Sequence, residues 1–122
     1  MQYNKTNDKT IRLRYIRVLE KFITRTITLL KKEDFNLDLY KTAVEKNYAE
    51  MKKSASIELF NEYPVALKNL AQTIMDTLEN HSNDFEDEKQ YILKQSNLLH
   101  KLKNNSRYKK DKHKKKKFTD GY

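Results

Sequence analysis

The chain has 122 residues, with 26 basic and 17 acidic side chains and a net charge of +9. It contains no cysteine, which excludes disulfides and thiolate metal sites. It contains one glycine and one proline, so the residues that form hairpin turns and barrel corners are scarce. With 37% apolar residues, we expect an all-helical protein with a modest core.

The charge is distributed unevenly along the chain. Residues 1–32 contain nine basic and two acidic side chains, residues 33–100 contain seven and thirteen, and residues 101–122 contain ten and two. Two cationic ends therefore flank an acidic middle. Such an asymmetry favours a nucleic acid or a membrane surface as the partner.

The longest apolar-periodic stretch, residues 10–32, predicts a basic amphipathic helix. At about 100° per residue its main apolar positions lie within about 80° of one another and form one buried stripe. These positions are Ile16, Leu19, Ile23, Ile27 and Leu30. The opposite side carries Arg14, Arg17, Lys21 and Arg25. Two interpretations are open: the solvated face of an ordinary core helix, or an electrostatic surface for a polyanion.

Three further helices are expected. Apolar residues recur at three or four positions over 37–63, which predicts a second helix of 27 residues with a weak point at its serines in 52–56. Pro64 suits a first helical position and should start the third helix. The expected core of that helix is Leu67, Leu70, Ala71, Ile74 and Leu78. The fourth helix begins with acids at 84–88 and should end near Lys103, matching the helix dipole.

We therefore expect an all-α fold, with three to four helices in an antiparallel bundle over residues 1–105 and the first helix at its centre. Residues 106–122 should form a lysine-rich flexible tail, disordered or frayed, because like charges repel and bury nothing. The excess length of the second helix and the wide apolar face of the first suggest a homodimer.

Local signatures of enzyme chemistry are missing from the sequence. A phosphate-binding loop needs glycines, but the single glycine is Gly121, and the three histidines lack metal-ligand spacing. The spacing of Arg107 and His113 is similar to the Arg-x4–6-His element of helical HEPN-type ribonucleases, but both residues lie in the lysine-rich tail, and no family is assigned. We expect a non-enzymatic protein that uses no cofactor and no metal.

The tail mixes basic and aromatic residues, a combination that neutralises phosphates and stacks on unpaired bases. Its cations are Arg107, Lys109, Lys110, Lys112, Lys114, Lys115, Lys116 and Lys117. The main hypothesis is an accessory protein that binds DNA or RNA largely independently of sequence, through this tail and the basic face of the first helix. The tail also has simpler explanations, such as solubility or a lysine-rich coding bias.

A rival hypothesis is a helical adaptor or chaperone-like protein that binds a partner helix in an apolar groove. Gln95 and Ser96 interrupt the apolar stripe of the fourth helix and would leave such a groove open. A third hypothesis folds the tail back onto the acidic segment 76–88. No stretch approaches the ~18 apolar residues of a membrane span, so we expect a cytoplasmic protein without stable membrane insertion.

Overall fold

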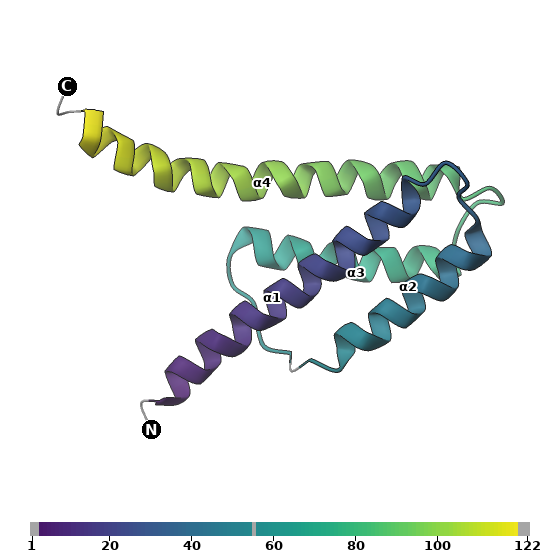
Figure 1. Cartoon of the computed structure of the whole chain (residues 1–122), viewed down its shortest axis with the longest axis horizontal. Coiled ribbons are helices and arrows are strands. Elements are labelled where there is room, and N and C mark those ends of the chain that lie inside the picture. The colour runs from purple at the N-terminus through teal and green to yellow at the C-terminus, as the bar shows by residue number, and fades with distance from the viewer. Residues whose placement is uncertain (1–2, 55, 120–122) are drawn as a thin grey trace.

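A computed structural model describes the backbone of residues 3–54 and 56–119, and the side chains of residues 8–54 and 56–104. This part of the chain forms four helices and no strand: α1 (Tyr3–Leu30), α2 (Leu37–Lys52), α3 (Glu62–Glu79) and α4 (Glu86–Thr119). Successive helices run in opposite directions (Figure 1). The predicted all-helical antiparallel bundle is confirmed, with four helices.

The centre of the bundle is the pair α1 and α3. These helices pack against each other and each contacts both α2 and α4, whereas α2 and α4 share no contact within the described residues. The expected central place of the first helix is confirmed, although α3 shares it. As a result α1 has two flanks, one facing α2 and one facing α4, and both are important for the surface described below.

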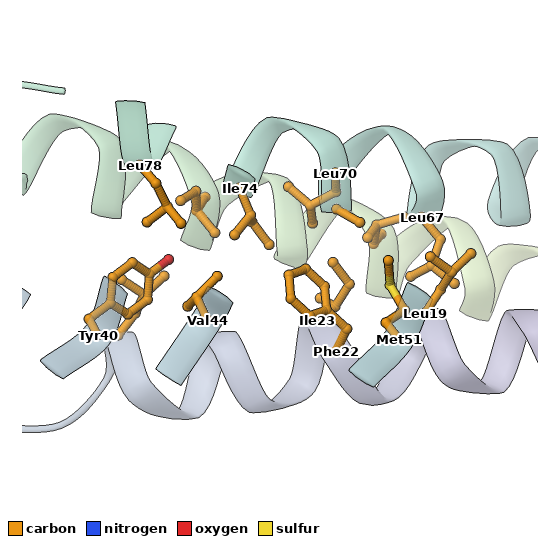
Figure 2. Packing of buried hydrophobic residues seen from close by; sticks show 14 of the residues in the cluster. Leu19, Phe22, Ile23, Tyr40, Val44, Met51, Leu67, Leu70, Ile74 and Leu78 are labelled. Atoms are coloured by element: carbon orange, nitrogen blue, oxygen red, sulfur yellow. The ribbon is translucent and has the colours of Figure 1, made fainter. Parts of the chain in front are cut away.

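The core is one continuous cluster of apolar side chains drawn from all four helices. Figure 2 shows side chains of α1 and α2 pointing toward those of α3. Leu19 and Leu30 of α1 have no exposed surface. The five residues predicted as the core face of α3 are all buried: Leu67, Leu70, Ala71, Ile74 and Leu78. Helical periodicity therefore located the contact faces of the two central helices.

The second helix is shorter than its pattern predicts. α2 ends at Lys52, where the backbone N–H groups of Lys53 and Ser54 donate to the last carbonyls of the helix. Residues 56–60 are not helical, yet Ile57 and Leu59 still pack against the core. The prediction of 27 residues is wrong because apolar spacing continued through a non-helical segment that also faces the core. The length of the second helix therefore no longer supports a homodimer, and the homodimer stays a prediction.

The third helix begins slightly earlier than expected. Asn61 is its N-cap and Glu62 its first residue, so Pro64 lies within the first turn rather than at the first position. The amide groups of the first turn have no partner inside a helix, so a proline costs little at any of these positions.

The loop between α3 and α4 is organised around Phe85, which has a φ of 61° and no exposed surface. Its ring centroid lies 5.3 Å from that of Tyr40 and 6.1 Å from that of Phe35, so packing offsets the unfavourable left-handed backbone. The hydroxyl of Ser82 donates to Oε1 of Glu88 at 2.7 Å, and its backbone N–H donates to Oε2 at 3.0 Å. These hydrogen bonds hold the pKa of Glu88 below its usual range.

The longest helix is α4, which extends beyond the rest of the bundle (Figure 1). Its 34 residues span about 50 Å, against about 27 Å for α3. The end of α4 therefore lies far from the acidic start of the same helix, which speaks against a tail folded back onto residues 76–88. No helix in the described part of the chain is long and apolar enough to span a membrane.

The tail cations predicted to bind nucleic acid fall on side chains outside the described residues. The backbone of this segment continues α4 as a helix as far as Thr119. The division into a bundle at 1–105 and a tail at 106–122 stays a prediction.

Candidate nucleic-acid interface

The four cations predicted on the first helix form one exposed row, here called the basic stripe: Arg14, Arg17, Lys21 and Arg25. They recur every three or four residues, so their side chains lie on one face of α1. The opposite face buries Leu19 and Ile23 in the core. The stripe therefore lies on the exposed side of α1, with Lys21 and Arg25 at the edge next to α2, and its exposure agrees with the sequence pattern.

No residue of the basic stripe forms an ion pair with a described side chain. The ion pairs in the described part of the chain join Lys53 to Glu50 at 3.3 Å and Lys103 to Glu20 at 2.8 Å. Nη1 of Arg25 donates to the neutral Oδ1 of Asn47 at 3.5 Å, a long contact. The described carboxylates therefore leave the positive charge of the stripe unpaired.

A shallow hollow of about 170 Å³ lies along the stripe, between α1 and α2. Lys21, Arg25 and Glu50 all line it, as do Met51 and Ser54. Glu50 is the single acid in this lining, and its carboxylate already pairs with Lys53. The hollow therefore keeps a net positive lining.

Arg12 belongs to α1 but has a structural role. Its Nε donates to the carbonyl oxygen of Glu58 at 3.3 Å, and its guanidinium carbon lies 4.7 Å from the ring centroid of Phe60. Both partners belong to the non-helical segment after α2. Arg12 thus fastens that segment to α1, whereas the four stripe residues stay exposed.

A larger hollow of about 360 Å³ opens where α1, α2 and α3 meet. We call it the tyrosine–lysine hollow after four residues that line it: Tyr15, Tyr48, Lys52 and Lys68. Nζ of Lys52 lies 5.4 Å from the ring centroid of Tyr48, and Nζ of Lys68 lies 6.0 Å from that of Tyr15. Cation–π attraction therefore holds both ammonium groups near the hollow.

The sequence did not indicate this hollow, because its two lysines belong to different helices and share no local pattern. The only local signal is the four-residue spacing of Tyr48 and Lys52, which places their side chains together on one helix face. Met51 and Ser54 line both this hollow and the shallow one beside the basic stripe, so the two adjoin.

The other flank of α1 carries a hollow of about 350 Å³ between α1, α3 and α4, here called the glutamate hollow. Oε2 of Glu20 accepts a hydrogen bond from the Tyr63 hydroxyl at 2.6 Å and another from Nζ of Lys103 at 2.8 Å. The only acid of the predicted basic helix therefore serves a contact between helices. It does not neutralise the basic stripe.

A fourth depression of about 280 Å³ runs between α3 and α4. Tyr91 and Leu98 line it and are 51% and 47% exposed. Gln95 also lines it, as the rival hypothesis expected, whereas Ser96 is buried in the bundle. This apolar groove is the surface on which an adaptor role depends.

Within the described residues, no group of three or more His, Cys, Asp or Glu side chains is placed to hold a metal ion. No protein-family model, curated protein or solved structure matches this chain. The case for a function therefore depends on the surfaces described above.

Proposed function

We propose that this protein is a non-enzymatic accessory protein that binds DNA or RNA through phosphates, largely independently of sequence. The observation that carries the proposal is the basic stripe, four exposed cations on one face of α1 that no described carboxylate pairs. Guanidinium groups match the oxygens of a phosphate with two parallel hydrogen bonds, and three of the four stripe residues are arginines. The cations of residues 106–122 would add long-range attraction.

The physics of phosphate binding makes the proposal quantitative. Each phosphate contact releases condensed counterions, so the logarithm of affinity falls with the logarithm of salt by about 0.9 per contact on a duplex. Four contacts from the stripe predict a slope of about −3.6 and a loss of affinity of ~10²-fold between 50 and 200 mM salt. Contacts to phosphates carry no sequence information, so oligonucleotides of different sequence should bind alike.

The test is fluorescence anisotropy of the full chain with labelled single- and double-stranded DNA and RNA at several salt concentrations. The stripe variant R14Q/R17Q/K21Q/R25Q should reduce the slope of log affinity against log salt by about 3 to 4 units and weaken the binding of every nucleic acid. The matched control K9Q/K46Q/K94Q/K101Q also loses four exposed positive charges but keeps the stripe. Equal effects of the two variants, or no binding by the unaltered protein at 50 mM salt, would overturn the proposal.

The tail has its own test. Replacing the lysines among residues 109–117 with glutamine in the full chain should weaken all nucleic acids by a similar factor, because these residues supply charge rather than base contacts. If the stripe provides the docking surface, the remaining affinity should still depend on Arg14 and Arg17. Complete loss of binding in the tail variant would show that the tail alone binds nucleic acid and that the stripe is not a docking surface.

One observation favours a second function, the binding of a partner protein's helix. The groove between α3 and α4 presents Tyr91 and Leu98, large apolar side chains that are about half exposed. A variant with both residues changed to serine should lose such a partner in a quantitative comparison of co-purified proteins and keep its nucleic-acid binding. An unchanged set of partners would count against the adaptor role.

A further inference from the structure

The tyrosine–lysine hollow has the charge of an anion site. Lys52 and Lys68 both line it, and none of its lining residues is acidic. The ring contacts described above limit the freedom of both ammonium groups, so less conformational entropy is lost when they bind a ligand. Asn69 and Gln72 also line the hollow, although Nε2 of Gln72 donates to Oδ1 of Asp76 at 3.0 Å.

The hydroxyl of Tyr15 is a further polar group at the hollow. Tyr15 is 7% exposed and lines the hollow, and its hydroxyl forms no hydrogen bond with a described residue, yet it is not shut off from solvent as the Tyr40 hydroxyl is. Burial raises the pKa of Tyr15, the Tyr48 hydroxyl raises it further, and Lys52 lowers it. Two side chains that line the same hollow therefore affect the pKa of this phenol. At neutral pH the hydroxyl keeps the proton that it would donate to a ligand.

The end of α2 carries the opposite partial charge, because the last carbonyls of a helix point outward. Here the carbonyls of Glu50 and Met51 already accept hydrogen bonds from the backbone N–H groups of Lys53 and Ser54. Their negative ends are therefore partly satisfied, and the two full charges of the lysines outweigh them. Pockets that hold small molecules measure roughly 300 to 1,000 Å³, so this hollow has room for one nucleotide unit.

We propose that the tyrosine–lysine hollow binds a phosphate group, with the ammonium groups of Lys52 and Lys68 and the hydroxyl of Tyr15 donating to its oxygens. This inference deepens the proposed function and rests on it in one respect. Because the hollow adjoins the basic stripe, a single strand on α1 would bring one of its phosphates to the hollow. A free mononucleotide carries the same group and is the other source.

The experiment is a ¹H–¹⁵N NMR titration of the full chain with adenosine monophosphate, inorganic phosphate and adenosine. The two phosphate-containing ligands should shift the amide signals of residues around the hollow, including Tyr15 and Lys68, and adenosine should not. Equal shifts with adenosine, or shifts confined to residues elsewhere, would overturn the inference.

Variants test which side chains bind the phosphate. K52Q/K68Q should weaken the binding of adenosine monophosphate by about tenfold or more, because both charged hydrogen-bond donors to the phosphate are lost. K46Q/K94Q removes the same charge from exposed positions outside the hollow and should leave the affinity unchanged. Tyr15→Phe keeps the buried ring and should weaken binding by a smaller factor. Equal affinities for the two double variants would overturn the inference.

A fourth compound, an oligonucleotide, separates this inference from the proposed function. A thymidine octamer should shift signals at both the basic stripe and the hollow if the strand supplies the phosphate. If adenosine monophosphate shifts the hollow but the octamer does not bind, the phosphate site stands with a free nucleotide as its source, and the proposed function fails. If the octamer shifts only the stripe and adenosine monophosphate does not bind, the inference fails and the function stands.

Discussion

The two large hollows on the flanks of α1 share a pairing of tyrosine with lysine, but only one of them has an acid in its lining. Their volumes are about 360 and 350 Å³, and each combines a tyrosine with a lysine over its ring. The separations are 6.0 Å for Lys68 and Tyr15, and 5.6 Å for Lys103 and Tyr63. In the glutamate hollow the carboxylate of Glu20 accepts from both partners. The tyrosine–lysine hollow has no such acid in its lining.

This difference shows why counting lysines says little about function. A lysine with an acid of the same chain beside it contributes to the fold, because the two charges satisfy each other. A lysine without one keeps its capacity to bind an external anion. The placement of a single acid, which the linear sequence does not reveal, decides between these two roles.

The largest expected effect comes from the core that supports both hollows. Leu19 has no exposed surface and lines the tyrosine–lysine hollow. Leu19→Ala should lower the free energy of unfolding by about 2–5 kcal/mol, because it removes buried apolar surface and leaves a cavity. Because both hollows are built on α1, NMR shifts should spread to each of them. Leu13→Ala makes the same change at a position that is 49% exposed. Denaturant unfolding should show little change in its free energy of unfolding. Equal losses for the two variants would contradict this account.

The fold was predictable where buried faces repeat with helical spacing. Leu19, Ile23 and Ile74 lie where periodicity predicts, because α1 and α3 each pack one continuous face into the centre. The end of α2 was not predictable in this way. Leu59 continues the spacing of that helix, but it lies in a non-helical segment that Arg12 holds against the bundle. Apolar spacing reports which residues face the core and does not by itself report the backbone that carries them.

The site was predictable only where it lies on one helix. Arg14, Arg17 and Lys21 follow from their spacing along α1, and the structure shows them exposed. The tyrosine–lysine hollow combines residues 15, 48, 52 and 68 from three helices, so its assembly depends on tertiary packing. Glu20 illustrates the same limit, since its partners Tyr63 and Lys103 are distant in the chain.

A smaller effect is expected from removing the charge that distinguishes the two hollows. Glu20→Gln should lower the free energy of unfolding by about 1–2 kcal/mol, because Lys103 loses its charged partner and the Tyr63 hydroxyl loses a charged acceptor. The same variant should give the glutamate hollow a weak affinity for inorganic phosphate, visible as new shifts of the amide signals around Lys103. Glu79→Gln, at an exposed position outside both hollows, is the control. If the Glu20 variant gains no phosphate binding, a lysine and a tyrosine alone do not make an anion site, and the comparison is incomplete.

The smallest effect concerns two buried tyrosines whose hydroxyls differ in access to a hollow. Tyr40 is 2% exposed, and its hydroxyl is buried without a hydrogen-bond partner. Tyr40→Phe should therefore raise the free energy of unfolding by about 1 kcal/mol at pH 7, because it removes an unsatisfied polar group. The Tyr15 hydroxyl lies beside a hollow, where a ligand or solvent satisfies it, so Tyr15→Phe should change stability less. Denaturant unfolding of both variants measures this difference, and a larger gain for Tyr15→Phe would contradict it.

The pH dependence sharpens the same contrast. Burial raises the pKa of both phenols above the ordinary value of 10.0. The unfolded chain therefore loses these protons first as the pH rises. Well below pH 10 both phenols are neutral in the folded and the unfolded chain, so their titration does not affect stability. As the pH climbs through 10 toward the folded-state pKa values, the free energy of unfolding falls. Tyr40 has the larger upward shift, so Tyr40→Phe should remove more of the decline in stability between pH 9 and 11 than Tyr15→Phe. Equal slopes in this range would mean that the Tyr40 hydroxyl is hydrated in solution, and the contrast between the two tyrosines would then disappear.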